Sequence, residues 1–176
     1  MGRRERKNVM NARHSMQTSQ WFTPPEYVEA AREVMRSIDL DPASCAEANK
    51  VVRARTYHSE QEDGLAWLWR GNVFLNPPGG KNAQGSLVRQ FWERLILSDG
   101  VEQAIWIGYS LEQLQTLQAC VATPLSYPMC VPRRRIAFVG AGKSPSHGNY
   151  ITYIGESMAG RRRFSDIFSR FGQVRL

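Results

Sequence analysis

The sequence predicts a mixed α/β fold, a central sheet with helices on both faces. Apolar segments of strand length alternate with amphipathic helices over the first two thirds of the chain, and the last third is β-rich. A chain of 176 residues, 42% of them hydrophobic, can bury one sizeable core, so we expect a single domain over 21–176. In such sheets ligands bind at the carboxyl ends of the strands.

Residues 1–20 differ from the rest of the chain, because they carry five basic residues, one acid and almost no large apolar side chain. We expect a flexible basic arm, which is either a solvated tail or a segment that contacts phosphates. The net charge of +7 favours a polyanionic partner, and nucleic acid is the commonest candidate.

The first ordered element is a helix that begins after Thr23. Thr23 and Glu26 form a capping box, and two prolines occupy the first turn. A short strand over 38–42 follows, and a second capping box of Ser44 with Glu47 opens the next helix.

Strands and helices continue to alternate in the middle of the chain. The predicted elements are a strand over 73–75, a helix over 86–97, a strand over 103–109 and a helix over 111–120. The strand over 73–75 ends in Asn-Pro-Pro, and a glycine-rich loop follows it.

The sequence of the last third of the chain predicts a C-terminal β-hairpin. Its strands are 134–140 and 149–155, and the loop 141–148 joins them. A short helix over 164–172 then precedes a final strand.

Asn76, Pro77 and Pro78 place an amide at a rigid corner after a buried strand. The prolines fix φ and lack N–H donors, so the Asn76 side-chain oxygen and the Pro77 carbonyl can accept the two hydrogens of an exocyclic amine. This withdraws the nitrogen lone pair from ring conjugation and activates the amine as a nucleophile. The alternative is that the motif only terminates a strand.

Four segments, in this order and at this spacing, resemble the small phage-encoded DNA N6-adenine methyltransferases: Trp-Phe-Thr-Pro-Pro at 21–25, Asp-Leu-Asp-Pro-Ala-Ser at 39–44, Glu-Asp-Gly-Leu at 62–65 and Leu-Asn-Pro-Pro at 75–78. The resemblance covers roughly 18–176. It implies a Rossmann-like sheet, S-adenosylmethionine as cofactor and DNA as substrate. It also implies base flipping and direct in-line methyl transfer to adenine N6, without a covalent enzyme intermediate.

The resemblance further implies roles for individual residues. Asn76, Pro77 and Pro78 match the catalytic motif, whereas the cofactor positions are Trp21, Thr23, Pro24, Asp41, Ala43 and Asp63. Local explanations also exist for two of these: Thr23 can simply cap a helix, and Asp63 with Gly64 can form a turn.

Two departures from the family pattern keep alternatives open. The turn after the first strand has no glycine, and Gly79 stands where the pattern has an aromatic residue that stacks on the flipped base. Candidate replacements for that ring are Phe91, Trp92, Trp106 and Tyr109. The alternatives are a catalytically inactive DNA-binding protein of this fold, and methyl transfer to cytosine N4 or to a protein glutamine.

Basic clusters flank the predicted hairpin. They are Arg133, Arg134 and Arg135 at its start and Arg161, Arg162 and Arg163 after it, with Lys143 and His147 in its loop. We expect them to clamp phosphates around an extruded base, the alternative being ordinary solvated charge.

Cysteine and histidine usage predicts no metal site. The three cysteines show no Cys-x-x-Cys pattern, and the three histidines are scattered. No apolar run approaches the roughly 18 residues of a membrane span. We therefore expect no membrane association and a location in the reducing cytoplasm of a bacterial host.

Overall fold

The computed structural model describes residues 21–140 and 147–176, so the predicted basic arm over 1–20 and Lys143 lie outside the described residues. The helices are α1 (Pro25–Met35), α2 (Ala46–Val52), α3 (Leu87–Ile96), α4 (Gln113–Leu117) and α5 (Met158–Phe168), with short 3-10 turns at η1 (Gly64–Ala66) and η2 (Pro124–Ser126). The strands are β1 (Leu40–Asp41), β2 (Thr56–Tyr57), β3 (Gly71–Leu75), β4 (Lys81–Asn82), β5 (Gly85–Ser86), β6 (Val101–Gly108), β7 (Met129–Pro132), β8 (Tyr150–Gly155) and β9 (Gly172–Arg175).

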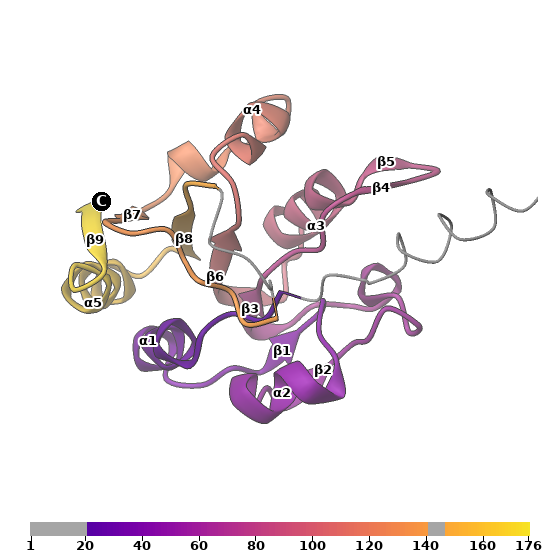
Figure 1. Cartoon of the computed structure of the whole chain (residues 1–176), viewed down its shortest axis with the longest axis horizontal. Helices are drawn as coiled ribbons and strands as arrows, with labels where there is room; N and C mark the ends of the chain where they lie inside the picture. Colours follow the sequence, from indigo (N-terminus) through magenta and orange to yellow (C-terminus); the bar gives the residue numbers. More distant parts are fainter. Residues whose placement is uncertain (1–20, 141–146) are drawn as a thin grey trace, which may run out of the picture.

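Seven strands form one sheet in the order β2-β1-β3-β6-β8-β7-β9, and β4 and β5 form a separate small hairpin (Figure 1). The pairs from β2 to β6 are parallel, whereas β8 and then β7 and β9 pair antiparallel. The carboxyl ends of β1, β3 and β6 therefore meet at one edge, here called the carboxyl edge. Because Gly108 pairs with Tyr150, the antiparallel strand β8 begins at this same edge.

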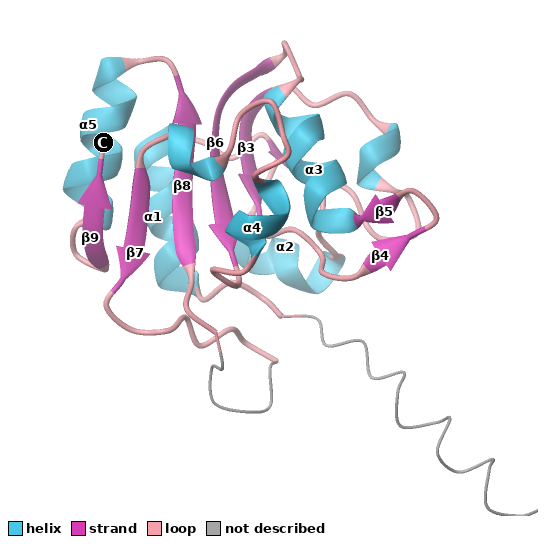
Figure 2. Ribbon diagram, turned by 90° about the horizontal axis from the view of Figure 1, so that it is seen from above, coloured by secondary structure: helices cyan, strands magenta, loops and turns pink. Residues whose placement is uncertain are grey.

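Helices cover both faces of the sheet (Figures 1 and 2). Side chains alternate along each strand, so Phe74 and Ile105 pack with α1, α2 and α5, whereas Val73 and Trp106 pack with α3 and α4. The prediction of a mixed α/β fold with helices on both faces is confirmed.

Both predicted helix caps are wrong in detail. The residue before α1 is Pro24, and no side chain caps that helix; the Thr23 hydroxyl is buried without a partner among the described residues. At α2, Cys45 takes the place predicted for Ser44, since its sulfur accepts a hydrogen bond from the Ala48 N–H at 3.4 Å. Proline at the first helical position supplies the φ that starts α1 without a side-chain cap.

The predicted C-terminal hairpin is wrong in its first strand. β8 pairs with β6 on one side and, on the other, with β7, which lies before 134–140. The connection over 133–140 runs along the carboxyl edge, where Val139 forms an isolated antiparallel bridge with Phe22. The predicted strand begins with two consecutive arginines, Arg134 and Arg135, which do not fit a strand that is covered on both faces; this explains the shift.

The later elements also differ from the prediction. Ser157 caps α5, which starts before 164, so Arg161, Arg162 and Arg163 lie in a helix and do not flank a hairpin. β2 and the β4–β5 hairpin are not predicted by the sequence pattern, because two-residue strands are too short to show a period.

Phe164 tests the packing of α5 on the sheet. It is fully buried, with its ring centroid 5.7 Å from that of Tyr153 and 4.8 Å from that of Phe168. We expect Phe164→Ala to lower the free energy of unfolding by about 3–5 kcal/mol, because it opens a cavity in the core. Chemical denaturation measures this change. Leu97→Ala, at an exposed position, is the control and is expected to change stability by less than about 0.5 kcal/mol.

Candidate active site

A cleft of about 840 Å³ opens at the carboxyl edge of the sheet. The predicted catalytic and cofactor residues that line it are Trp21, Thr23, Asp41, Ala43, Asp63, Asn76, Pro77 and Pro78. Pro24 is buried beside it and is not part of the lining. Asp41 and Asn76 meet in one concave site because β1 and β3 are parallel neighbours. Trp21 and Thr23, which lie more than 50 residues before Asn76, line the same site.

The Asn76 carboxamide is fixed by one hydrogen bond. Its Nδ2 donates to the Trp21 backbone carbonyl at 2.8 Å. A carbonyl oxygen only accepts hydrogen bonds, so the amide nitrogen must be the atom that faces it and Oδ1 lies on the other side of Cγ. Oδ1 and the Pro77 carbonyl accept no hydrogen bond from the described residues, so both are available to a ligand in the cleft.

Asp41 is a buried carboxylate at the end of β1. Its side chain is 3% exposed and belongs to no ion pair within the described part of the chain. Burial raises the pKa of Asp41 to about 6, although the nearby Ser44 hydroxyl and the hydrogen bond from the Ala43 N–H oppose the shift. The Ala43 N–H lies 3.2 Å from Oδ1. A carboxylate in this environment favours a cationic or hydroxyl-bearing ligand.

Three further polar groups of the cleft have no hydrogen-bond partner in 21–140 or 147–176. They are the Thr23 hydroxyl, the Ser44 hydroxyl and the Trp21 indole N–H, all of which are buried. Buried polar groups are almost always hydrogen-bonded in native proteins, so these three are candidates for contact with a ligand.

The turn at Asp63 packs against the turn after β1. Asp63 has φ of 49° and accepts a hydrogen bond from the Leu65 N–H at 3.2 Å, so it does form a local turn. Gly64 is required here, since a Cβ on it would lie 1.8 Å from the Pro42 carbonyl oxygen. Asp63 and Gly64 therefore form a local turn and also line the cleft, so the turn does not argue against a role in the site.

Three aromatic side chains from distant segments line the cleft together. The Trp21 ring stacks on Phe138 with a centroid distance of 6.3 Å and meets Tyr109 edge-on at 6.4 Å. Among the other rings that the sequence suggested, Phe91 is 5% exposed at the cleft wall, whereas Trp92 and Trp106 are fully buried in the core.

Asn149 is a structural residue of the site that sequence reasoning missed. It is buried at the start of β8, where its Oδ1 accepts from the Ile136 N–H and its Nδ2 donates to the Tyr109 carbonyl, both at 2.7 Å. It thereby ties the connection over 133–140 to the end of β6. No local pattern marks this residue, because its partners lie far away in the chain.

The predicted DNA-binding arginines separate into two places. Arg133, Arg134 and Arg135 follow β7 at the carboxyl edge, and Arg133 donates to the carbonyls of Ser169 and Arg170 at the end of α5. Arg134 is exposed.

Arg161, Arg162 and Arg163 lie at the start of α5, which follows the end of β8 at the opposite edge of the sheet. Arg161 donates to the Gly155 carbonyl at 3.4 Å and Arg163 to the Val34 carbonyl at 2.9 Å, whereas Arg162 is exposed. The structure does not bring this second cluster to the cleft.

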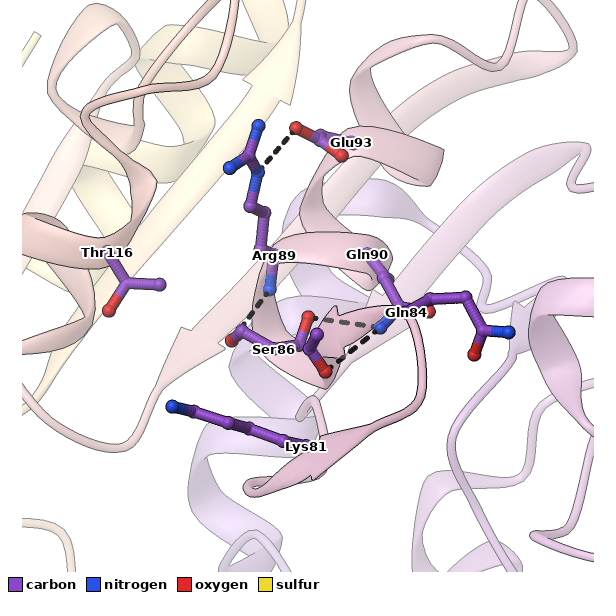
Figure 3. Close-up of a pocket in the computed structure, with 8 residues that line it drawn as sticks. Lys81, Gln84, Ser86, Arg89, Gln90, Glu93 and Thr116 are labelled. Carbon is purple, nitrogen blue, oxygen red and sulfur yellow. Dashed lines mark hydrogen bonds and ion pairs between the residues drawn. The ribbon is translucent and has the colours of Figure 1, made fainter.

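A second concavity, of about 630 Å³, adjoins the β4–β5 hairpin (Figure 3). Lys81 lines both this hollow and the cleft, so the hairpin forms the wall between them. Arg89 points toward Glu93 and pairs with it at 2.8 Å, which leaves Lys81 as the cation of this wall without an ion-pair partner among the described residues.

Within the described ranges, no three His, Cys, Asp or Glu side chains are grouped closely enough to hold a metal ion. No described helix has the length and apolar character that crossing a membrane requires.

No protein-family model matches the chain, and neither a curated protein sequence nor a solved structure matches it significantly.

Proposed function

We propose that this protein is an S-adenosylmethionine-dependent methyltransferase with a Rossmann-like fold that acts on adenine N6 in DNA. The observation that carries the proposal is the orientation of the Asn76 carboxamide, which Trp21 fixes with Oδ1 left as an acceptor. Oδ1 and the Pro77 carbonyl are the acceptor pair that an exocyclic amine needs to become nucleophilic.

The residues of the cleft fit the proposed cofactor. Asp41 is a buried carboxylate without a cation, which suits an ammonium group or a ribose hydroxyl. The Thr23 hydroxyl and the Trp21 indole N–H supply further unsatisfied polar groups on the same lining. Ala43 and Asp63 complete the wall beside Asp41.

The chain's own residues position and polarise the amine. Asn76 Oδ1 and the Pro77 carbonyl accept its two hydrogens, while Pro77 and Pro78 hold the corner rigid without competing N–H donors. S-adenosylmethionine, held beside Asp41 and Thr23, would supply an electrophilic sulfonium methyl group; its transfer to N6 would leave a thioether and release one N6 proton to solvent.

The proposed DNA surface is the carboxyl edge. Lys81 lies on the hairpin wall of the cleft, and Arg134 lies on the connection that runs along the same edge. Both are exposed and have no ion pair within the described part of the chain. Cations on either side of a cleft can contact the phosphates that flank an extruded base.

Methyl transfer is tested directly with labelled S-adenosylmethionine and unmethylated DNA. We expect labelled N6-methyladenine after digestion, identified by mass spectrometry. Asn76→Ala is expected to lower the rate at least about 100-fold, because it removes one acceptor of the polarised amine. Gln118→Ala, at an exposed position of the chain after α4, is the matched control and is expected to keep the wild-type rate.

Other results of that assay separate the alternatives. Label on cytosine N4 or on a protein glutamine would keep the enzyme and change its acceptor. DNA binding without any label, together with failure to bind the cofactor, would replace the proposal with an inactive DNA-binding protein of this fold.

Asp41 links the site to stability. Its pKa is about 6 in the folded protein, against 3.8 normally. The folded protein therefore keeps a proton that the unfolded chain releases, so stability falls as pH rises through this window. We expect Asp41→Asn to raise the free energy of unfolding by about 2–3 kcal/mol at pH 7.5 and to have little effect near pH 3.5.

Denaturation curves at the two pH values, together with calorimetric titration of S-adenosylmethionine, measure both effects of Asp41→Asn. The variant is expected to lose cofactor affinity while gaining stability. Asp99→Asn, at an exposed turn, is the control and is expected to change neither. Unchanged cofactor affinity in Asp41→Asn would remove Asp41 from the proposed cofactor site.

The position of the DNA surface predicts a contrast between two exposed arginines. Arg134→Glu is expected to weaken DNA binding, since Arg134 lies at the carboxyl edge. The slope of log K against the logarithm of the salt concentration is expected to become shallower by about 1, the value that corresponds to one lost phosphate contact. Arg162→Glu makes the same charge change at the opposite edge and is expected to leave the salt slope unaltered. Fluorescence anisotropy with labelled duplex at several salt concentrations measures both; equal losses would place DNA elsewhere.

A further inference from the structure

We propose that Tyr109 is the residue that stacks on the substrate base, in place of the aromatic side chain that position 79 lacks. This inference rests on the proposed function. It identifies the ring that holds the base and places it at the end of β6, outside the Asn-Pro-Pro motif.

The evidence begins with the space above Gly79. A Cβ built on Gly79 would lie 3.2 Å from the Tyr109 hydroxyl oxygen and 3.6 Å from the ring carbon that bears it. The hydroxyl end of the Tyr109 side chain therefore lies beside the space into which a side chain at position 79 begins to project. A ring added at 79 would compete with Tyr109 for this space, so the glycine at 79 leaves room for the tyrosine at 109.

Strand register explains how the two positions meet. Leu75 of β3 pairs with Trp106 of β6, and both strands leave the sheet at the carboxyl edge in the same direction. Gly79 lies four residues beyond Leu75 and Tyr109 three residues beyond Trp106. The two segments stay adjacent after the sheet ends, so β6 can deliver a ring to the place that the motif leaves open.

The Tyr109 ring is held and yet accessible. Trp21 meets it edge-on, and Asn149 holds its backbone carbonyl at 2.7 Å. Tyr109 is only partly buried, and it lines the same cleft as Asn76, whose Nδ2 is bound to the carbonyl of Trp21. One residue, Trp21, therefore contacts both the amide and the ring.

The test measures base stacking without cofactor or chemistry. Wild-type protein is titrated against single-stranded (dA)12 and against the same 12-mer with abasic sites, and the affinity ratio between the two is recorded by fluorescence anisotropy. We expect a preference for (dA)12 that falls about 5- to 140-fold in Tyr109→Leu, which keeps apolar bulk but removes the ring. Tyr109→Phe keeps the ring and is expected to keep the ratio.

A swap of the two positions separates stacking from a structural role. The double variant Gly79→Tyr/Tyr109→Leu is expected to recover much of the preference for (dA)12, because the ring returns to the same space from the other strand. Thermal unfolding of each variant shows that the fold is retained. An unchanged ratio in Tyr109→Leu, or no preference in the wild type, would overturn the inference. The methyl-transfer assay with Asn76→Ala is independent of this ratio, so a failure of one does not imply a failure of the other.

Discussion

The hydrogen bond from Asn76 Nδ2 to the Trp21 carbonyl organises the carboxyl edge of this protein. It joins the start of the described chain to the end of β3 and decides which heteroatom of the carboxamide is left to accept. The same N-terminal segment continues into the bridge between Phe22 and Val139, and the connection that contains Val139 is tied through Ile136 to Asn149. The site is therefore held together by a chain of contacts between segments that are far apart in sequence.

The two edges of the sheet use polar residues in opposite ways. At the opposite end of these strands, Asn72 donates to the Met35 carbonyl and accepts from Gln103, while Asp39 accepts from the Asn72 N–H, so these buried and half-buried groups satisfy one another. At the carboxyl edge, the Thr23 hydroxyl and the Trp21 indole N–H are buried without a partner among the described residues. Polar groups that stabilise a fold are paired, whereas groups left unpaired at a concave edge are a cost that ligand binding can offset.

Local patterns in the sequence predict part of this structure and long-range pairing determines the rest. The periodicity of apolar residues predicts α1, α3, β3 and β6, and the rule that ligands bind at carboxyl ends places Asp41 and Asn76 in one site. The β-rich composition of 134–140 does not reveal that β7 precedes it, because strand partners are chosen by packing. The contacts of Tyr109 with position 79 and of Asn149 with β6 depend on register, which no single segment encodes.

The reversed direction of β8 has a consequence for how the C-terminal sequence can vary. Because β8 runs against β6, its first residue, Tyr150, lies at the carboxyl edge and its last, Gly155, at the opposite edge. A change immediately before β8, as at Asn149, therefore acts next to the candidate site. A change at the exposed Arg162 of α5, after β8, alters the surface charge at the far edge of the sheet without reaching that site. A single strand thus places neighbouring parts of the C-terminal sequence at opposite ends of the sheet.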